Sequence, residues 1–183
     1  AMTRCLANAP KLPGRTLFLI DISGSMSGAL SGKSTLDRID AACALAVLLR
    51  EVAEEPVIYA TAGSDLRQVH KTALVPPRRG FALRDAVVGL NATLGGGGIF
   101  LTQAMAYVAA KERAPFARSI VFTDEQDCDN DSERATSKAQ TLAEHAYIIN
   151  VAGYKTGVAA HGKWMRVSGF SERVVDWMMA EEG

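Results

Sequence analysis

Short apolar runs alternate along the chain with longer stretches in which apolar residues recur at helical spacing. The apolar runs cover residues 17–20, 57–60, 120–122 and 147–151, with a weaker pattern over 66–75. Runs of this length predict strands buried on both faces, and 66–75 is expected to be an edge strand. The helical stretches cover about 34–54, 81–90, 102–111, 132–145 and 171 onward. Strands separated by such helices pair in parallel, so we expect an α/β fold with a mostly parallel central sheet and helices on both faces.

Two of the expected helices carry start signals. Ser34, followed three residues later by Asp37, fits a capping box at the start of the first long helix. Ser171 is placed to cap the last helix, where Phe170 and Val175 fit a hydrophobic staple. These signals predict the residues at which the two helices begin.

Length and composition indicate one globular domain. The chain has 183 residues, of which 48% are hydrophobic and 22% charged, and this composition excludes a disordered chain. Residues 1–13 lack periodicity and are interpreted as a lead-in or linker, and 14–183 as the domain. No apolar run approaches the roughly 20 residues of a membrane span, and no signal peptide opens the chain. We therefore expect no membrane partner. Three scattered cysteines match no disulfide framework and no zinc spacing, so we expect a cytoplasmic protein.

The balance of charge bears on nucleic-acid binding. Lys and Arg together number 20, as do Asp and Glu, so the formal net charge is zero. A domain that binds nucleic acid by itself usually carries an excess of positive charge. We therefore do not expect this chain alone to bind RNA tightly.

Hydroxyl and carboxylate side chains gather at the predicted ends of two strands. Asp21, Ser23 and Ser25 alternate directly after the first strand, and Asp124 follows the strand at 120–122. In parallel sheets the chemistry lies at the carboxyl ends of strands, where these side chains can converge. Carboxylate and hydroxyl oxygens are hard donors that suit Mg²⁺ or Mn²⁺ rather than zinc. The sequence therefore predicts a site for a divalent cation, although the same side chains could simply cap the turns.

Four sequence segments resemble known families. LFLIDISGSM at 17–26 resembles the first strand and metal motif of von Willebrand factor A domains, the metal-ion-dependent adhesion site. SIVFTDEQ at 119–126 is similar to their strand with a metal-linked Asp, and GGGGIFLTQAM at 95–105 stands in the place of their second metal loop. GFSERVVDWM at 169–178 resembles the C-terminal segment of Ro-type (TROVE) proteins, which bind small noncoding RNAs.

The resemblance implies a Rossmann-like three-layer sandwich with a divalent ion at its carboxyl-end face. Ser23 and Ser25 would coordinate the ion, Asp21 and Asp124 would bind it or hold its waters, and an acidic protein group or a phosphate would complete the site. The implied function is a non-enzymatic binding module. In a Ro-type protein, noncoding RNA would be bound mainly through helical repeats that this chain lacks.

One position departs from the family pattern of Gly-Gly-Thr. Ile99 stands where the pattern places the threonine, and its side chain has no oxygen donor. Thr102 lies three residues later, where we expect it to cap a helix first and to serve as a ligand second. The departure predicts weak metal binding in which water replaces the missing hydroxyl.

Two other functions remain open at the level of sequence. Residues 27–35, SGALSGKST, resemble a Walker A phosphate loop, which would make the chain a P-loop NTPase. Only three residues separate Gly28 from Gly32, however, where the motif needs four, and Lys33 is otherwise expected to be a solvated loop lysine. The third possibility is a structural module whose metal site is degenerate.

Overall fold

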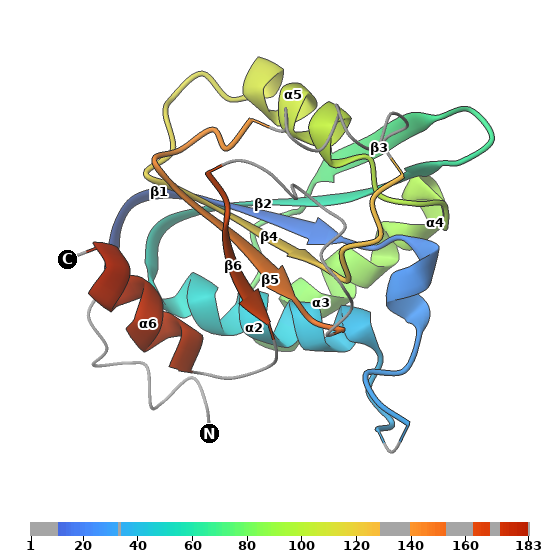
Figure 1. Ribbon diagram of the computed structural model, residues 1–183, viewed down its shortest axis with the longest axis horizontal. Coiled ribbons are helices and arrows are strands. Elements are labelled where there is room, and N and C mark those ends of the chain that lie inside the picture. The colour runs from blue at the N-terminus through green and yellow to red at the C-terminus, as the bar shows by residue number, and fades with distance from the viewer. Residues whose placement is uncertain (1–10, 33, 129–139, 153–162, 169–172, 183) are drawn as a thin grey trace.

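The computed structural model describes residues 11–32, 34–128, 140–152, 163–168 and 173–182 (Figure 1). Its centre is a six-stranded sheet in the order β3-β2-β1-β4-β5-β6. The strands are β1 (Leu12–Asp21), β2 (Ala53–Ser64), β3 (Val69–Leu74), β4 (Arg118–Thr123), β5 (His145–Asn150) and β6 (Met165–Ser168). Every neighbouring pair is parallel except β2 and the edge strand β3.

Helices cover both faces of the sheet, as Figure 1 shows with α5 on one side and α2, α3 and α6 on the other. Their bounds are α2 (Arg38–Val52), α3 (Gly80–Gly89), α4 (Asn91–Leu94), α5 (Leu101–Lys111) and α6 (Arg173–Glu182), with a short 3₁₀ helix η1 (Gly24–Ser27) after β1. Side chains alternate along β1, so Phe18 and Ile20 join the core under α2 while Leu17 and Leu19 join the core under α5. The predicted α/β sandwich is confirmed.

The start of the first long helix differs from the prediction. Helix α2 begins at Arg38, with Asp37 as its N-cap, and the Asp37 carboxylate accepts a hydrogen bond of 2.7 Å from the backbone N–H of Asp40. The Ser34 hydroxyl instead accepts the N–H of Leu36. The predicted capping box at Ser34 is therefore wrong. Ala29 and Asp37 form a backbone bridge before the helix starts, so the helix begins after Asp37.

The helix predicted over 132–145 is wrong in its described part. Residues 140–144 are not helical, Leu142 has a positive φ of 56°, and His145 opens β5 rather than ending a helix. Residues 129–139 lie outside the described part of the chain, as do Phe170 and Ser171. Strand β6 was not predicted, because four residues with two polar side chains give little periodic signal.

A buried ion pair attaches the last helix to the sheet. Arg118, 2% exposed, opens β4, and its guanidinium contacts the Glu182 carboxylate with a shortest N–O distance of 2.5 Å. The same guanidinium donates to the carbonyl of Pro13 and the hydroxyl of Thr16, and the Tyr147 hydroxyl donates to Glu182. This cluster joins α6 to β1, β4 and β5.

No helix in the described part of the chain is long and apolar enough to span a membrane.

Removing one partner of this pair should be strongly destabilising. We expect Glu182→Ala to lower the free energy of unfolding by about 3 kcal/mol, because Arg118 would stay buried without its carboxylate. Glu181→Ala, at the exposed neighbouring position, should change it by less than about 0.5 kcal/mol. Urea denaturation of both variants measures the difference, and equal stabilities would show that the pair does not anchor the helix.

Candidate metal centre

Parallel pairing of β1 with β4 brings the two predicted acidic positions together. Ile20 pairs with Phe122, so the strands end side by side, and Asp21 and Asp124 lie at adjacent ends. Both carboxylates are fully buried. Two negative groups removed from water at one edge need hydrogen bonds or cations to stabilise them.

Asp21 is held by two hydrogen bonds from its own loops. The backbone N–H of Ser23 donates to Oδ1 at 2.8 Å, and the Thr123 hydroxyl donates to Oδ2 at 2.7 Å. Thr123 Oγ1 also accepts the N–H of Glu125, so it links the two strand ends. The sequence places the Thr123 hydroxyl at this strand end, directly before Asp124, but Thr123 was not among the predicted site residues. Asp21 is thereby fixed in one orientation.

The remaining predicted residues form a short chain of oxygen atoms. Ser23 Oγ lies 3.2 Å from Ser25 Oγ, and Ser25 Oγ donates to Asp124 Oδ1 at 3.1 Å. Mg²⁺ binds oxygen at about 2.1 Å, which places adjacent ligands of an octahedron about 3 Å apart. Both spacings therefore fit neighbouring positions in a Mg²⁺ coordination sphere, and all four predicted residues lie at one place.

The donor set is limited to two carboxylates and hydroxyl groups. In the described part of the chain, no group of three or more His, Cys, Asp or Glu side chains is placed to hold a metal ion. A site of this composition therefore depends on serine oxygens and water, which hard cations accept and zinc does not favour.

The glycine-rich segment at 95–98 packs directly on the loop that carries the serines. The N–H of Gly24 donates to the carbonyl of Gly97, and a Cβ on Gly24 would lie only 2.4 Å from the carbonyl oxygen of Gly96. A Cβ on Gly97 would meet the carbonyl of Gly63 at 2.3 Å. Both positions therefore require glycine, and the segment meets the serine loop through its backbone.

The structure places Ile99, which departs from the family pattern, and Thr102, which was expected to cap a helix. Ile99 is fully buried in the core under α5, where it packs with Leu17 and Leu19. Thr102 is the second residue of α5, whose N-cap is Phe100, so the expectation that Thr102 caps the helix is wrong. A hydroxyl at position 99 would enter apolar surroundings, which explains physically why isoleucine is accepted there.

Two arginines that sequence reasoning missed accompany the acids. Arg38 Nη1 lies 3.0 Å from Asp124 Oδ2 and donates to the Ser25 carbonyl at 2.8 Å. On the other side, Arg166 Nε of β6 lies 3.5 Å from the Glu125 carboxylate. Neither contact has a local signal in the sequence. Arg38, for example, is 86 residues from Asp124 and reaches it only through the fold.

The segment that resembles a Walker A loop does not lead directly into a helix. The Leu30 N–H donates to the Leu36 carbonyl and the Arg38 N–H to the Gly28 carbonyl, so the segment around 28–37 folds back on itself. A phosphate loop leads directly into a helix, whose N-terminal N–H groups face the phosphate. Here α2 begins only at Arg38, and Lys33 lies outside the described residues.

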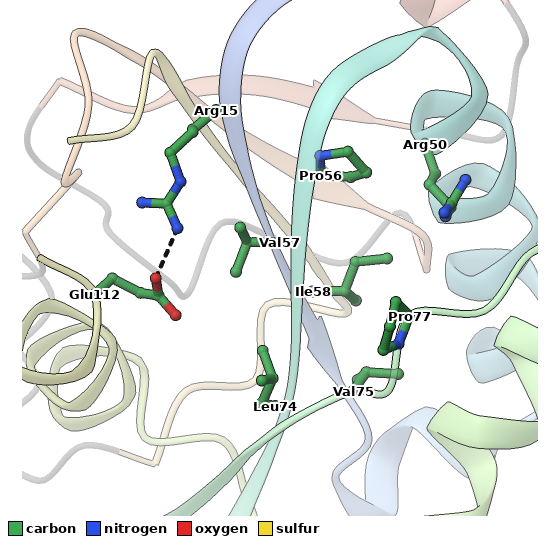
Figure 2. Close-up of a pocket in the computed structure, with 9 residues that line it drawn as sticks. All are labelled: Arg15, Arg50, Pro56, Val57, Ile58, Leu74, Val75, Pro77 and Glu112. Atoms are coloured by element: carbon green, nitrogen blue, oxygen red, sulfur yellow. Dashed lines mark hydrogen bonds and ion pairs between the residues drawn. The ribbon is translucent and has the colours of Figure 1, made fainter. Parts of the chain in front are cut away.

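A separate hollow lies at the opposite end of the sheet. Its volume is about 280 Å³. Figure 2 shows its lining residues, which include Arg15, Val57, Leu74 and Glu112. Arg15 pairs with Glu112 at 2.7 Å, drawn as a dashed line in Figure 2. The charges of that pair compensate each other, and the hollow lies away from the strand ends that carry the acids.

Two solved structures share this fold. The Ro (RSR) protein of Deinococcus radiodurans matches with a TM-score of 0.63 at 17% identity, over 97% of this chain and 36% of that one. An aerotolerance-related membrane protein from Bacteroides fragilis, carrying multiple mutations to serine, matches with a TM-score of 0.52 at 17% identity, over 75% of this chain and 67% of that one. The chain matches no protein-family model and no curated protein. It has a von Willebrand factor A-like fold, and it spans about a third of the length of the Ro protein.

Burial makes ionisation of Asp21 unfavourable when no metal is bound. Burial raises the pKa of Asp21 from 3.8 to about 6, and the nearby charge of Asp124 adds to the rise, against the hydrogen bonds from Ser23 and Thr123. The pKa of Asp21 is higher in the folded protein than in the unfolded chain. The contribution of Asp21 to the stability of the fold is therefore fully present below pH 3.8 and is lost as the pH rises through about 6.

Asp21→Asn should therefore stabilise the metal-free protein. In EDTA at pH 7.5 we expect the variant to gain about 2 kcal/mol, a rise of several degrees in Tm, because the amide is neutral. Its Oδ1 can still accept from the Ser23 N–H, and its NH₂ group can donate to Thr123 Oγ1 in place of the bond that the carboxylate accepts. The gain should shrink towards pH 4, where Asp21 is protonated. Thermal unfolding across this pH range is the measurement, with Asp176→Asn on the exposed face of α6 as the control. A lower Tm for Asp21→Asn at pH 7.5 would contradict the expectation.

Proposed function

We propose that this chain is a non-enzymatic, metal-dependent binding module. Ser23 and Ser25 coordinate Mg²⁺ or Mn²⁺ directly, and Asp21 and Asp124 bind the ion or hold its waters. The observation that carries the proposal is the row of oxygens from Ser23 through Ser25 to Asp124, with spacings of 3.2 and 3.1 Å. This spacing supports octahedral coordination of a hard cation.

The bound ion would supply positive charge for an anionic oxygen of a partner. The rest of the mechanism belongs to the chain itself. Thr123 and the Ser23 backbone orient Asp21, while Gly24 keeps the serine loop against the Gly96 and Gly97 backbone. A carboxylate of an acidic protein, or a phosphate, would then complete the coordination sphere.

The Ro-type resemblance supports a place for this module in a larger protein. The likeness to the Deinococcus Ro protein supports the shared fold, and GFSERVVDWM supports the narrower relationship. In this proposal the chain is the C-terminal part of a cytoplasmic Ro-type protein. Noncoding RNA is then bound by the full-length protein rather than by this domain alone.

The NTPase alternative is disfavoured by the position of Arg38 as the first residue of α2, after the chain around 28–37 has folded back on itself. A structural module with a degenerate site is the stronger competitor. It differs from a binding module in one respect, which is whether the serine and aspartate oxygens take up a metal ion.

Isothermal titration with Mg²⁺ and Mn²⁺ tests the proposed site. We expect the unmodified chain to bind weakly, and Ser25→Ala to weaken Mn²⁺ binding at least about tenfold, because a direct ligand is replaced by water. Ser27→Ala is the matched control, since Ser27 lies in the same short helix with an exposed side chain. If neither metal binds the unmodified chain, the structural module is the correct reading. Equal affinities for the two serine variants would place the ion elsewhere.

The isolated chain should bind single-stranded RNA poorly. Its formal net charge is zero, and phosphate contacts supply most non-specific affinity. Filter binding at about 0.15 M salt, where screening is physiological, should detect no tight complex. Sub-micromolar binding by this chain alone would contradict the assignment of RNA recognition to the rest of a larger protein.

A further inference from the structure

Arg38 places a positive charge inside the proposed metal site. It is the first residue of α2, and its side chain turns back over Gly28, where an added Cβ would lie 3.2 Å from the guanidinium carbon. The Arg38 side chain is only 13% exposed. The guanidinium is therefore held by packing as well as by hydrogen bonds.

The two oxygens of Asp124 face different partners. Oδ1 accepts the hydrogen bond from Ser25 at 3.1 Å, on the side of the hydroxyl groups. Oδ2 lies 3.0 Å from Arg38 Nη1, and the same nitrogen donates to the Ser25 carbonyl at 2.8 Å. A cation bound by Ser25 and Asp124 would share this one carboxylate with the guanidinium.

We propose that Arg38 is a built-in competitor of the metal ion. It neutralises Asp124 when the site is metal-free, and it weakens metal binding because two cations must then share one buried carboxylate. This inference rests on the proposed metal-binding function. Charges a few ångströms apart near a protein surface interact strongly enough to change an affinity by about an order of magnitude.

The surrounding charges are consistent with this role. Glu125, the next acid along the chain, is paired with Arg166, whereas in the described part of the chain no basic side chain lies within ion-pair distance of Asp21. Two of the three buried acids are thus compensated by arginine without any metal. Arg38 would let the loops keep their arrangement in the metal-free state, and would set the metal concentration at which the site fills.

The test compares Arg38→Gln with Arg84→Gln. Glutamine keeps hydrogen-bond donors and removes the charge. Arg84 is a matched control because it pairs with Asp40 of α2 at 2.8 Å, so its removal changes the net charge equally without touching Asp124. We expect Arg38→Gln to bind Mn²⁺ about tenfold more tightly by titration calorimetry at 0.15 M salt, and Arg84→Gln to bind as the unmodified chain does.

Thermal unfolding gives a second measurement. Arg38→Gln should have a lower Tm than the unmodified chain in EDTA, and a larger rise in Tm when Mn²⁺ is added, because its metal-free state leaves Asp124 uncompensated. A purely structural role would lower the Tm equally with and without metal, and would overturn the proposal. Arg38→Met, which keeps an apolar stem over Gly28, gives the same comparison if the glutamine variant does not fold.

The outcomes separate this inference from the proposed function. If the unmodified chain binds Mn²⁺ and the Arg38 variants bind it equally or more weakly, Arg38 does not compete and this inference fails, while the metal site stands. If neither the unmodified chain nor any Arg38 variant binds Mn²⁺, both the inference and the proposed function fail. If Arg38→Gln binds Mn²⁺ more tightly than the unmodified chain and Arg84→Gln does not, the result supports both the inference and the proposed function.

Discussion

Two carboxylates buried at adjacent strand ends impose the main constraint on this protein. The parallel register of β1 with β4 places Asp21 beside Asp124, and both are removed from water. Hydrogen bonds and one ion pair from the neighbouring loops and α2 stabilise these two side chains. Thr123 and a backbone N–H donate to Asp21, and Ser25 and Arg38 donate to Asp124. The same groups that stabilise the acids define the oxygen spacing on which metal binding would depend.

The two ends of the sheet carry different kinds of interaction. The carboxyl end carries polar loops that converge on the buried acids, whereas the amino end is joined by ion pairs that compensate themselves, Arg118 with Glu182 and Arg15 with Glu112. The first pair attaches α6 to β4, and the second attaches the end of α5 to β1, at the end of the sheet opposite the serine loop. The ion pairs that hold these helices to the sheet therefore lie apart from the residues proposed to bind a metal ion.

Much of this arrangement could be predicted from sequence, because the informative signals were local. Apolar runs identified the buried strands of the parallel core, and alternating polar side chains after the first strand identified the serine loop. The start of α2 could not be predicted, because Ser34 and Asp37 are both good caps and only the pairing of Ala29 with Asp37 decides between them. Arg38 was missed for a related reason, since its partner lies in a strand end that the chain reaches only after two crossovers.

The contact between Gly24 and the segment at 95–98 has a consequence for how such proteins diverge. The two loops meet through main-chain atoms, so their packing asks only for the absence of a side chain at Gly24 and Gly97. Ile99, the residue that follows the segment, does not take part in this contact and packs in the core under α5 instead. A contact made in this way can persist through substitutions at other positions of the two loops, provided that both glycines are kept.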